Sequence, residues 1–134
     1  MSIEWPESLL TEIAERRCVI VLGAGASASS CNDAGQRPSS WTEFLEAGIA
    51  KIASENDRDA ATELLKENVP LDAAQVLADA LGAADFAHFI RQELVDPGFQ
   101  PSELHELIVR IDPKIVITTN YDNIYESLAT SGAA

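Results

Sequence analysis

Two short, wholly apolar runs stand out in a chain whose other apolar residues recur at helical spacing. Residues 18–22 read CVIVL, and residues 115–117 read IVI and are followed by two threonines. Runs of this length, rich in β-branched residues, predict strands rather than helices. Strands that are apolar on both sides are typical of parallel sheets covered on two faces. The pattern therefore indicates an α/β fold.

Around these runs the apolar spacing predicts helices over residues 7–17, 41–53, 57–67, 72–81, 85–95 and 102–111, and a last helix after Asp122. Ser40 and Glu43 have the spacing of a capping box at the start of the second helix, and Asp72 can cap the fourth. Residues 28–40 are small, polar and punctuated by Gly and Pro, which predicts a loop.

Two strands separated by a block of helices do not make a stable sheet alone. We therefore expect further strands after Ala134, with residues 1–134 forming the N-terminal portion of one domain. The apolar faces of both strands are then partly uncovered in this chain. Such a patch favours self-association unless a partner covers it. We expect a homo-oligomer, and a further domain or partner protein that completes or regulates the site.

The net charge of the chain limits its possible binding partners more than its composition does. Nine basic and 22 acidic residues give a formal net charge of −13, which disfavours direct contact with nucleic acid or an anionic membrane. We find no signal peptide and no apolar run long enough to span a bilayer, which predicts a cytoplasmic protein. Cys18 and Cys31 lack a CxxC spacing or a histidine at ligand spacing, which predicts free thiols and no metal site.

A glycine-rich turn follows the first strand. Its sequence, GAGASA over residues 23–28, matches the loose dinucleotide-binding pattern with alanine in place of the third glycine. If a helix begins near Ala26, its free N–H groups and its dipole favour a phosphate in the turn. The glycines could instead serve only the turn. An ordinary Rossmann oxidoreductase fits badly, because the expected acidic strand end about twenty residues on is replaced by a predicted helix.

Polar residues also follow the second strand, where residues 118–122 read TTNYD. Ligands of open parallel sheets bind outside the carboxyl ends of the strands, and both polar tips lie there. We therefore predict that the two strand ends together form a nucleotide site. Taken singly, Asn120 or Asp122 could be no more than the N-cap of the last helix.

The sequence GAGAS, a helical stretch and then ITTNYDNIYE together resemble the sirtuin superfamily, specifically its bacterial antiphage-defence branch of NAD hydrolases. Sirtuins have a Gly-Ala-Gly-x-Ser turn and a Thr-Gln-Asn-x-Asp strand end in these places. Thr119 and Tyr121 are typical of the defence-type hydrolases rather than of the deacetylases. Residues 37–41, RPSSW, are similar to that branch's Pro-x-x-Trp. The resemblance covers about residues 19–126.

The resemblance implies a Rossmann-like parallel sheet with a helical insertion, here an incomplete sirtuin-like domain. It implies hydrolysis of NAD to nicotinamide and ADP-ribose, in antiphage defence by NAD depletion. Asn120 would be catalytic, by orienting the nicotinamide ribose or the attacking water, and Asp122 would hold the nicotinamide carboxamide. The residues implied to contact NAD are Gly23, Ala24, Gly25, Ala26, Ser27, Thr118, Thr119, Asn120 and Asp122.

The family's catalytic histidine lies beyond the Asn-x-Asp motif, whereas no histidine follows Asp122 here. His88 lies on the polar side of its predicted helix, and His105 flanks an apolar stripe, so neither is expected to replace it. We therefore expect residues 1–134 to be inactive alone. Two other functions stay open: an NAD-dependent protein deacylase, which requires a downstream zinc ribbon, and a non-catalytic sensor of NAD or ADP-ribose. The stripe consists of Leu104, Leu107, Ile108 and Ile111.

Overall fold

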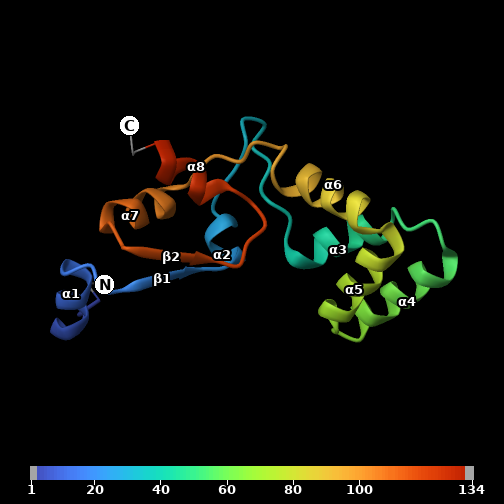
Figure 1. Cartoon of the computed structure of the whole chain (residues 1–134), viewed down its shortest axis with the longest axis horizontal. Coiled ribbons are helices and arrows are strands. Elements are labelled where there is room, and N and C mark those ends of the chain that lie inside the picture. The colour runs from blue at the N-terminus through green and yellow to red at the C-terminus, as the bar shows by residue number, and fades with distance from the viewer. Residues whose placement is uncertain (1–2, 132–134) are drawn as a thin grey trace.

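A four-helix block separates two parallel strands in the computed structural model, which describes residues 3–131. Figure 1 shows two lobes, which we call the sheet lobe and the helical lobe. The sheet lobe contains α1 (Glu7–Ala14), β1 (Val19–Leu22), α2 (Ala24–Ser27), α7 (Glu103–Ile111), β2 (Ile115–Thr118) and α8 (Ile124–Ser131). The helical lobe contains α3 (Trp41–Ile49), α4 (Glu55–Lys66), α5 (Pro70–Leu81) and α6 (Ala83–Leu94). The chain is therefore α/β and mostly helical.

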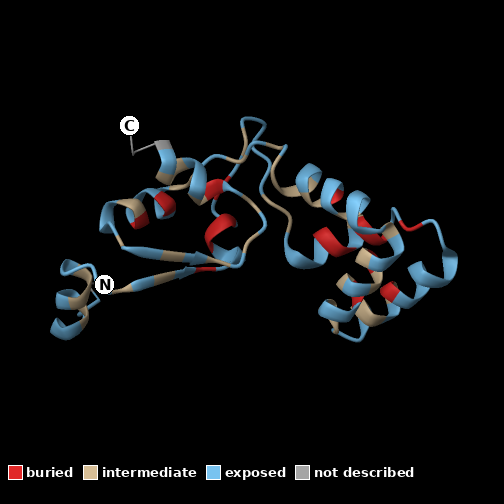
Figure 2. Ribbon diagram, viewed as in Figure 1, coloured by how far each residue is buried: buried red, intermediate tan, exposed pale blue. Residues whose placement is uncertain are grey.

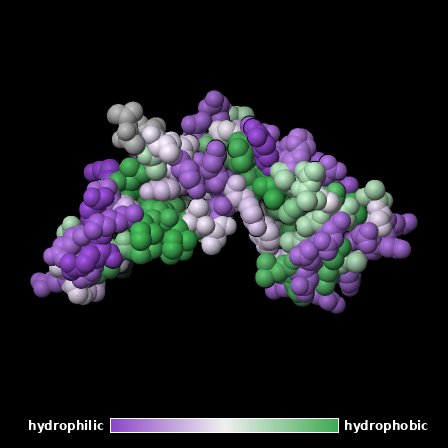
Figure 3. Space-filling view, viewed as in Figure 1, coloured by the Kyte–Doolittle hydropathy of each residue, from purple (hydrophilic) through white to green (hydrophobic). Residues whose placement is uncertain are grey.

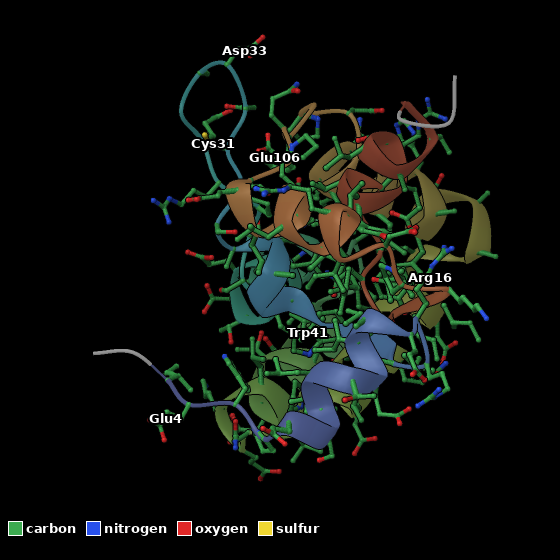
Figure 4. The ribbon with its side chains drawn as sticks, turned by 90° about the vertical axis from the view of Figure 1, so that its left-hand side faces the viewer. Glu4, Arg16, Cys31, Asp33, Trp41 and Glu106 are labelled. Atoms are coloured by element: carbon green, nitrogen blue, oxygen red, sulfur yellow. The ribbon has the colours of Figure 1, made fainter. Side chains whose placement is uncertain are left out.

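Two segments, residues 28–40 and 95–102, connect the lobes. They touch where the Gln100 N–H donates to the Cys31 carbonyl at 2.9 Å, as an isolated antiparallel bridge. The first segment is the loop that the sequence predicts, and it projects from the molecule with Asp33 at its tip (Figure 4).

The strands pair in parallel, with Val19 opposite Ile115 and Leu22 opposite Thr118. Helices α2, α7 and α8 lie on one side of them (Figure 1). On this covered face, side chains from both strands and all three helices form a small core. Its members are Ile20, Leu22, Ala26, Ile108, Val116 and Tyr125.

The helical lobe has its own, larger core, and Figure 2 shows many of the buried residues there. Phe44 of α3 and Phe89 of α6 meet with ring centroids 4.8 Å apart. Gly48 lets α3 approach α5 closely, because a Cβ at Gly48 would lie 2.4 Å from Leu77 Cδ2. The lobe that carries no strand is therefore the better packed of the two.

The other face of the sheet is bare. Val19, Val21, Ile115 and Ile117 are 50%, 66%, 53% and 48% exposed. Because Val19 pairs with Ile115 and Val21 with Ile117, the four side chains are contiguous. They belong to the green, apolar surface on the sheet lobe in Figure 3, and we call these four side chains the bare sheet face. This exposure confirms the expectation that the apolar faces of the two strands are partly uncovered in this chain.

Several helix ends differ from the sequence prediction. The first helix ends at Ala14 rather than at residue 17, because Arg16 adopts a left-handed conformation with φ of 57° and turns the chain into β1. Helix α4 begins two residues early, at Glu55, because Ser54 caps it. Asp72 does not cap α5, which begins at Pro70, where a missing N–H costs nothing.

We expect the bare sheet face to drive self-association. Val21→Lys places a charge in the patch and disturbs little packing, because Val21 is largely exposed. Light scattering should show a mass that rises with concentration for the wild type, and the 14.4 kDa monomer for the variant. Since chains of net charge −13 repel one another, added salt should strengthen the association. Leu71→Lys, at an exposed position of α5, is the control, and a monomeric wild type in high salt would contradict the prediction.

Candidate functional site

Side-chain hydrogen bonds join the carboxyl ends of the two strands. Asn120 Nδ2 donates to the Gly23 carbonyl at 3.1 Å and to Ser27 Oγ at 2.8 Å. Ser27 Oγ in turn donates to Asp122 Oδ2 at 2.7 Å. We call Ser27, Asn120 and Asp122 the strand-end cluster. It unites the two polar tips as the sequence predicts, although they are 95 residues apart.

The backbone around the cluster is fixed by the ends of the strands. The Thr119 N–H donates to the Leu22 carbonyl at 3.2 Å, which extends the pairing beyond β2. Thr118 Oγ1 accepts from the Asn120 N–H at 3.0 Å. Asp122 Oδ1 accepts from the Ile124 N–H at 3.1 Å, so Asp122 bonds the first N–H of α8. Asn120 is therefore not the helix cap, and its side chain instead ties β2 to the glycine-rich turn.

A cleft of about 990 Å³ opens beside the cluster, between the two lobes. This volume lies at the upper end of the range for small-molecule sites. One wall consists of Ala24, Gly25, Ser27, Ala28, Thr119, Asn120, Tyr121 and Asp122. The other wall consists of Arg37, Pro38, Ser39, Ser40, Trp41, Glu43, Phe44, Leu71 and Leu94.

Most of the residues that the resemblance assigns to NAD line this cleft, but three lie behind it. Gly23 presents its carbonyl to Asn120, and Thr118 presents its hydroxyl to the Asn120 N–H. Ala26 is buried in the small core on the covered face of the sheet. These three residues support the wall and do not form its surface.

Helix α2 is a single turn, rather than the start of a longer helix. So short a helix has few aligned peptide dipoles, so the dipole argument for phosphate binding loses most of its force. The two glycines are also not required by the fold, because a Cβ at Gly23 or Gly25 would meet nothing within 4 Å. The space beside Gly25 therefore opens into the cleft.

The far wall holds residues to which the sequence analysis gave no role. Arg37 is the only basic side chain among the lining residues, and Glu43 and Asp122 are the only acidic ones. Trp41 stacks on Phe44 with centroids 5.6 Å apart, which connects the cleft to the helical core. The signal that could have found Arg37 and Trp41 is the RPSSW segment, whose serine begins the capping box of α3.

That capping box is confirmed by the structure. The Ser40 N–H donates to Glu43 Oε2 at 2.7 Å, and Ser40 Oγ accepts from the Glu43 N–H at 3.3 Å. The bonds from Ser40 hold the pKa of Glu43 below its ordinary value. The carboxylate at this edge of the cleft is therefore ionised at neutral pH.

Helix α7 buries only one member of the predicted apolar stripe. Its leucines and Ile111 are exposed, and the buried residues are His105 and Ile108. His105 is 1% exposed, and its Nδ1 lies 3.2 Å from the Ser102 backbone nitrogen and 2.8 Å from Ser102 Oγ. Burial lowers the pKa of His105, and the negative charge of Asp122 acts in the opposite direction. The ring lies behind the cleft, whereas His88 is exposed as predicted.

Other site types find little support in the described part of the chain. Residues 3–131 contain no group of three His, Cys, Asp or Glu side chains that could hold a metal ion. Cys18 and Cys31 are free thiols. None of the helices described is both long and apolar enough to cross a bilayer.

Comparison of the chain with family models, with curated proteins and with solved structures finds no match.

Asn120→Ala should lower the free energy of unfolding by about 1–2 kcal/mol, because it removes both hydrogen bonds between the strand ends. Urea denaturation followed by circular dichroism measures this change. Asn123→Ala is the matched control, since Asn123 is exposed and uses only its backbone carbonyl, in a bond from the Ser127 N–H. Equal midpoints for the two variants would show that the tie between the strands contributes nothing.

Proposed function

We propose that the cleft binds NAD and that the chain is the NAD-binding part of a sirtuin-like NAD hydrolase, which releases nicotinamide and ADP-ribose. The observation that carries the proposal is the strand-end cluster. Its hydrogen bonds bring the GAGAS turn and the TNYD strand end together at one edge of a cleft large enough for a dinucleotide. The role in bacterial antiphage defence by NAD depletion belongs to the proposal through the sequence resemblance.

The charges along the cleft suit NAD. The molecule has a cationic nicotinamide ring at one end and an anionic diphosphate in the middle. Asp122 offers a carboxylate for the nicotinamide end, and Arg37 offers the one positive charge on the wall for the diphosphate. Gly25, with no side chain and open space beside it, allows a phosphate or ribose to approach the backbone.

Asn120 has one group left for a ligand. Both amide hydrogens are used within the protein, because Nδ2 donates to Gly23 and Ser27. Its Oδ1 can accept from a ribose hydroxyl or from an attacking water. Cleavage of the nicotinamide–ribose bond develops oxocarbenium character, which fixed dipoles stabilise, and the leaving group is already cationic. Positioning by Asn120 and charge from Asp122 are therefore the contributions that this chain can make.

The lining residues of the cleft include no histidine, and His105 is buried behind the wall. We therefore expect the chain to bind NAD without hydrolysing it, and a further domain or partner to supply the general base. The same observation favours a second candidate, a module that binds NAD or ADP-ribose and does no chemistry. The two candidates differ in whether the completed protein releases nicotinamide.

Calorimetry with NAD tests the proposed site. The wild-type chain should bind, and Gly25→Val should bind much more weakly, because its side chain projects into the cleft. The variant should fold, since a Cβ at Gly25 meets no other atom within 4 Å. Ala84→Val, at an exposed position of α6, is the matched control and should bind as the wild type does.

Each outcome decides one part of the proposal. Unchanged affinity in a folded Gly25→Val variant would remove the turn from the site. Failure of the wild type to bind either NAD or ADP-ribose would contradict the proposed function. A nicotinamide-release assay on the same samples tests the missing base, and turnover by the chain alone would show that its own residues suffice.

A further inference from the structure

A chain of hydrogen-bonding groups runs from α7 to the turn that lines the cleft. His105 Nδ1 lies 2.8 Å from Ser102 Oγ, and Ser102 Oγ lies 2.7 Å from Ser29 Oγ. Ser29 Oγ donates to the carbonyl of Ala26 at 2.8 Å. Ala26 lies between Gly25 and Ser27, both of which line the cleft. The imidazole is thus connected to the site wall through two serine hydroxyls.

The protonation of the ring determines which of these bonds can form. Ser102 donates its backbone N–H to Nδ1 only when Nδ1 carries no proton. The hydroxyls of Ser102 and Ser29 then supply two hydrogens for three contacts: to Nδ1, between the two hydroxyls, and to the Ala26 carbonyl. One of these contacts therefore lacks a hydrogen. When Nδ1 is protonated, all three contacts can be filled in one direction, toward the Ala26 carbonyl, but the Ser102 N–H loses its acceptor. Because Nδ1 accepts from the Ser102 N–H, the neutral ring carries its proton on Nε2, and Nδ1 gains a proton only when the ring becomes charged. The pattern of hydrogen bonds that reaches the turn therefore changes with the charge of the ring.

Burial makes a positive charge on this ring costly. His105 is 1% exposed, so its pKa is lowered, and the charge of Asp122 only partly offsets the effect of burial. Other titratable groups near this packing are Tyr125 and Glu126 on α8, and Glu103 and Glu106 on α7 itself. Helix α2 and the three residues after it bring only alanines, a glycine and serines. The imidazole is therefore neutral at pH 7, and it acquires a buried charge in acid.

We propose that His105 is a positioning residue for the cleft, and that its protonation shifts the turn at residues 25–28 and changes the affinity for a ligand. The identity of the ligand rests on the proposed function, whereas the coupling of His105 to the turn does not. The coupling can therefore be tested on the unliganded chain.

Amide chemical shifts measured by NMR from pH 8 to pH 5 test the coupling. The amides of residues 26–28 should shift with the same midpoint as the His105 ring. His105→Gln should abolish this titration, because a glutamine oxygen caps the Ser102 N–H without ionising. Ser29→Ala should leave the ring titrating and uncouple the turn. His88→Gln, on the exposed side of α6, is the control, and turn amides that ignore the ring, or that still follow it in Ser29→Ala, would overturn the proposal.

Stability supplies a second measurement. Because the pKa of His105 is lowered in the folded chain, the unfolded chain takes up the proton first as the pH falls below 6.5. The free energy of unfolding should therefore decline from pH 7 toward pH 5 in the wild type, and this decline should be smaller in His105→Gln. An equal decline in both proteins would mean that the ring is not held neutral by burial.

Ligand affinity supplies the functional measurement. The NAD dissociation constant of the wild type should change as the pH is lowered from 7.5 to 5.5, by at most about tenfold per pH unit below the His105 pKa. His105→Gln should show a flatter dependence. Parallel profiles in the two proteins would overturn the effect on binding. Absence of binding at both pH values would contradict the proposed function, while the NMR result would still decide the coupling.

Discussion

The parallel pairing of β1 with β2 is the interaction on which the candidate site depends. The strands are four residues each, and a ladder this short is marginal without support. Side chains fasten it at both ends. At the amino ends, Arg16 Nε donates to the Asp112 carbonyl at 2.8 Å, and its Nη2 bonds Asp112 Oδ1 at 2.8 Å. At the carboxyl ends, Asn120 bonds Gly23 and Ser27, so the fastening residues at this end are also the candidate site.

The helical lobe gives the cleft its second wall without contributing to the sheet. Its core holds α3 in place, and the stacked rings of Trp41 and Phe44 extend that core to the cleft surface. The wall is therefore as rigid as the packing behind it. The sheet-lobe wall depends instead on single hydrogen bonds between polar side chains.

Much of this arrangement could be predicted from local sequence. The apolar runs gave both strands, the Ser40–Glu43 spacing gave the start of α3, and the rule for strand ends brought Ser27 and Asn120 together. The burial of His105 could not be predicted, because Leu104 and Leu107 are more apolar and the choice of face depends on Ser102 and on α8. The far wall of the cleft could not be predicted from the sequence either, because the position of Arg37 beside the turn depends on the path of the loop between the lobes. The bare sheet face could be predicted, because two apolar strands separated by helices leave part of their surface without cover.

The two-stranded sheet has a consequence for local unfolding of the chain. Among the described residues, each strand has a neighbouring strand on one side only, so every second amide of each strand lacks a partner in the sheet and exchanges readily with solvent. Few apolar contacts hold these strands compared with the helical core, and regions of that kind unfold locally at the lowest free energy. The strands can therefore separate while α3–α6 stay folded, and a ligand that bridges the strand ends would raise the free energy of this local opening.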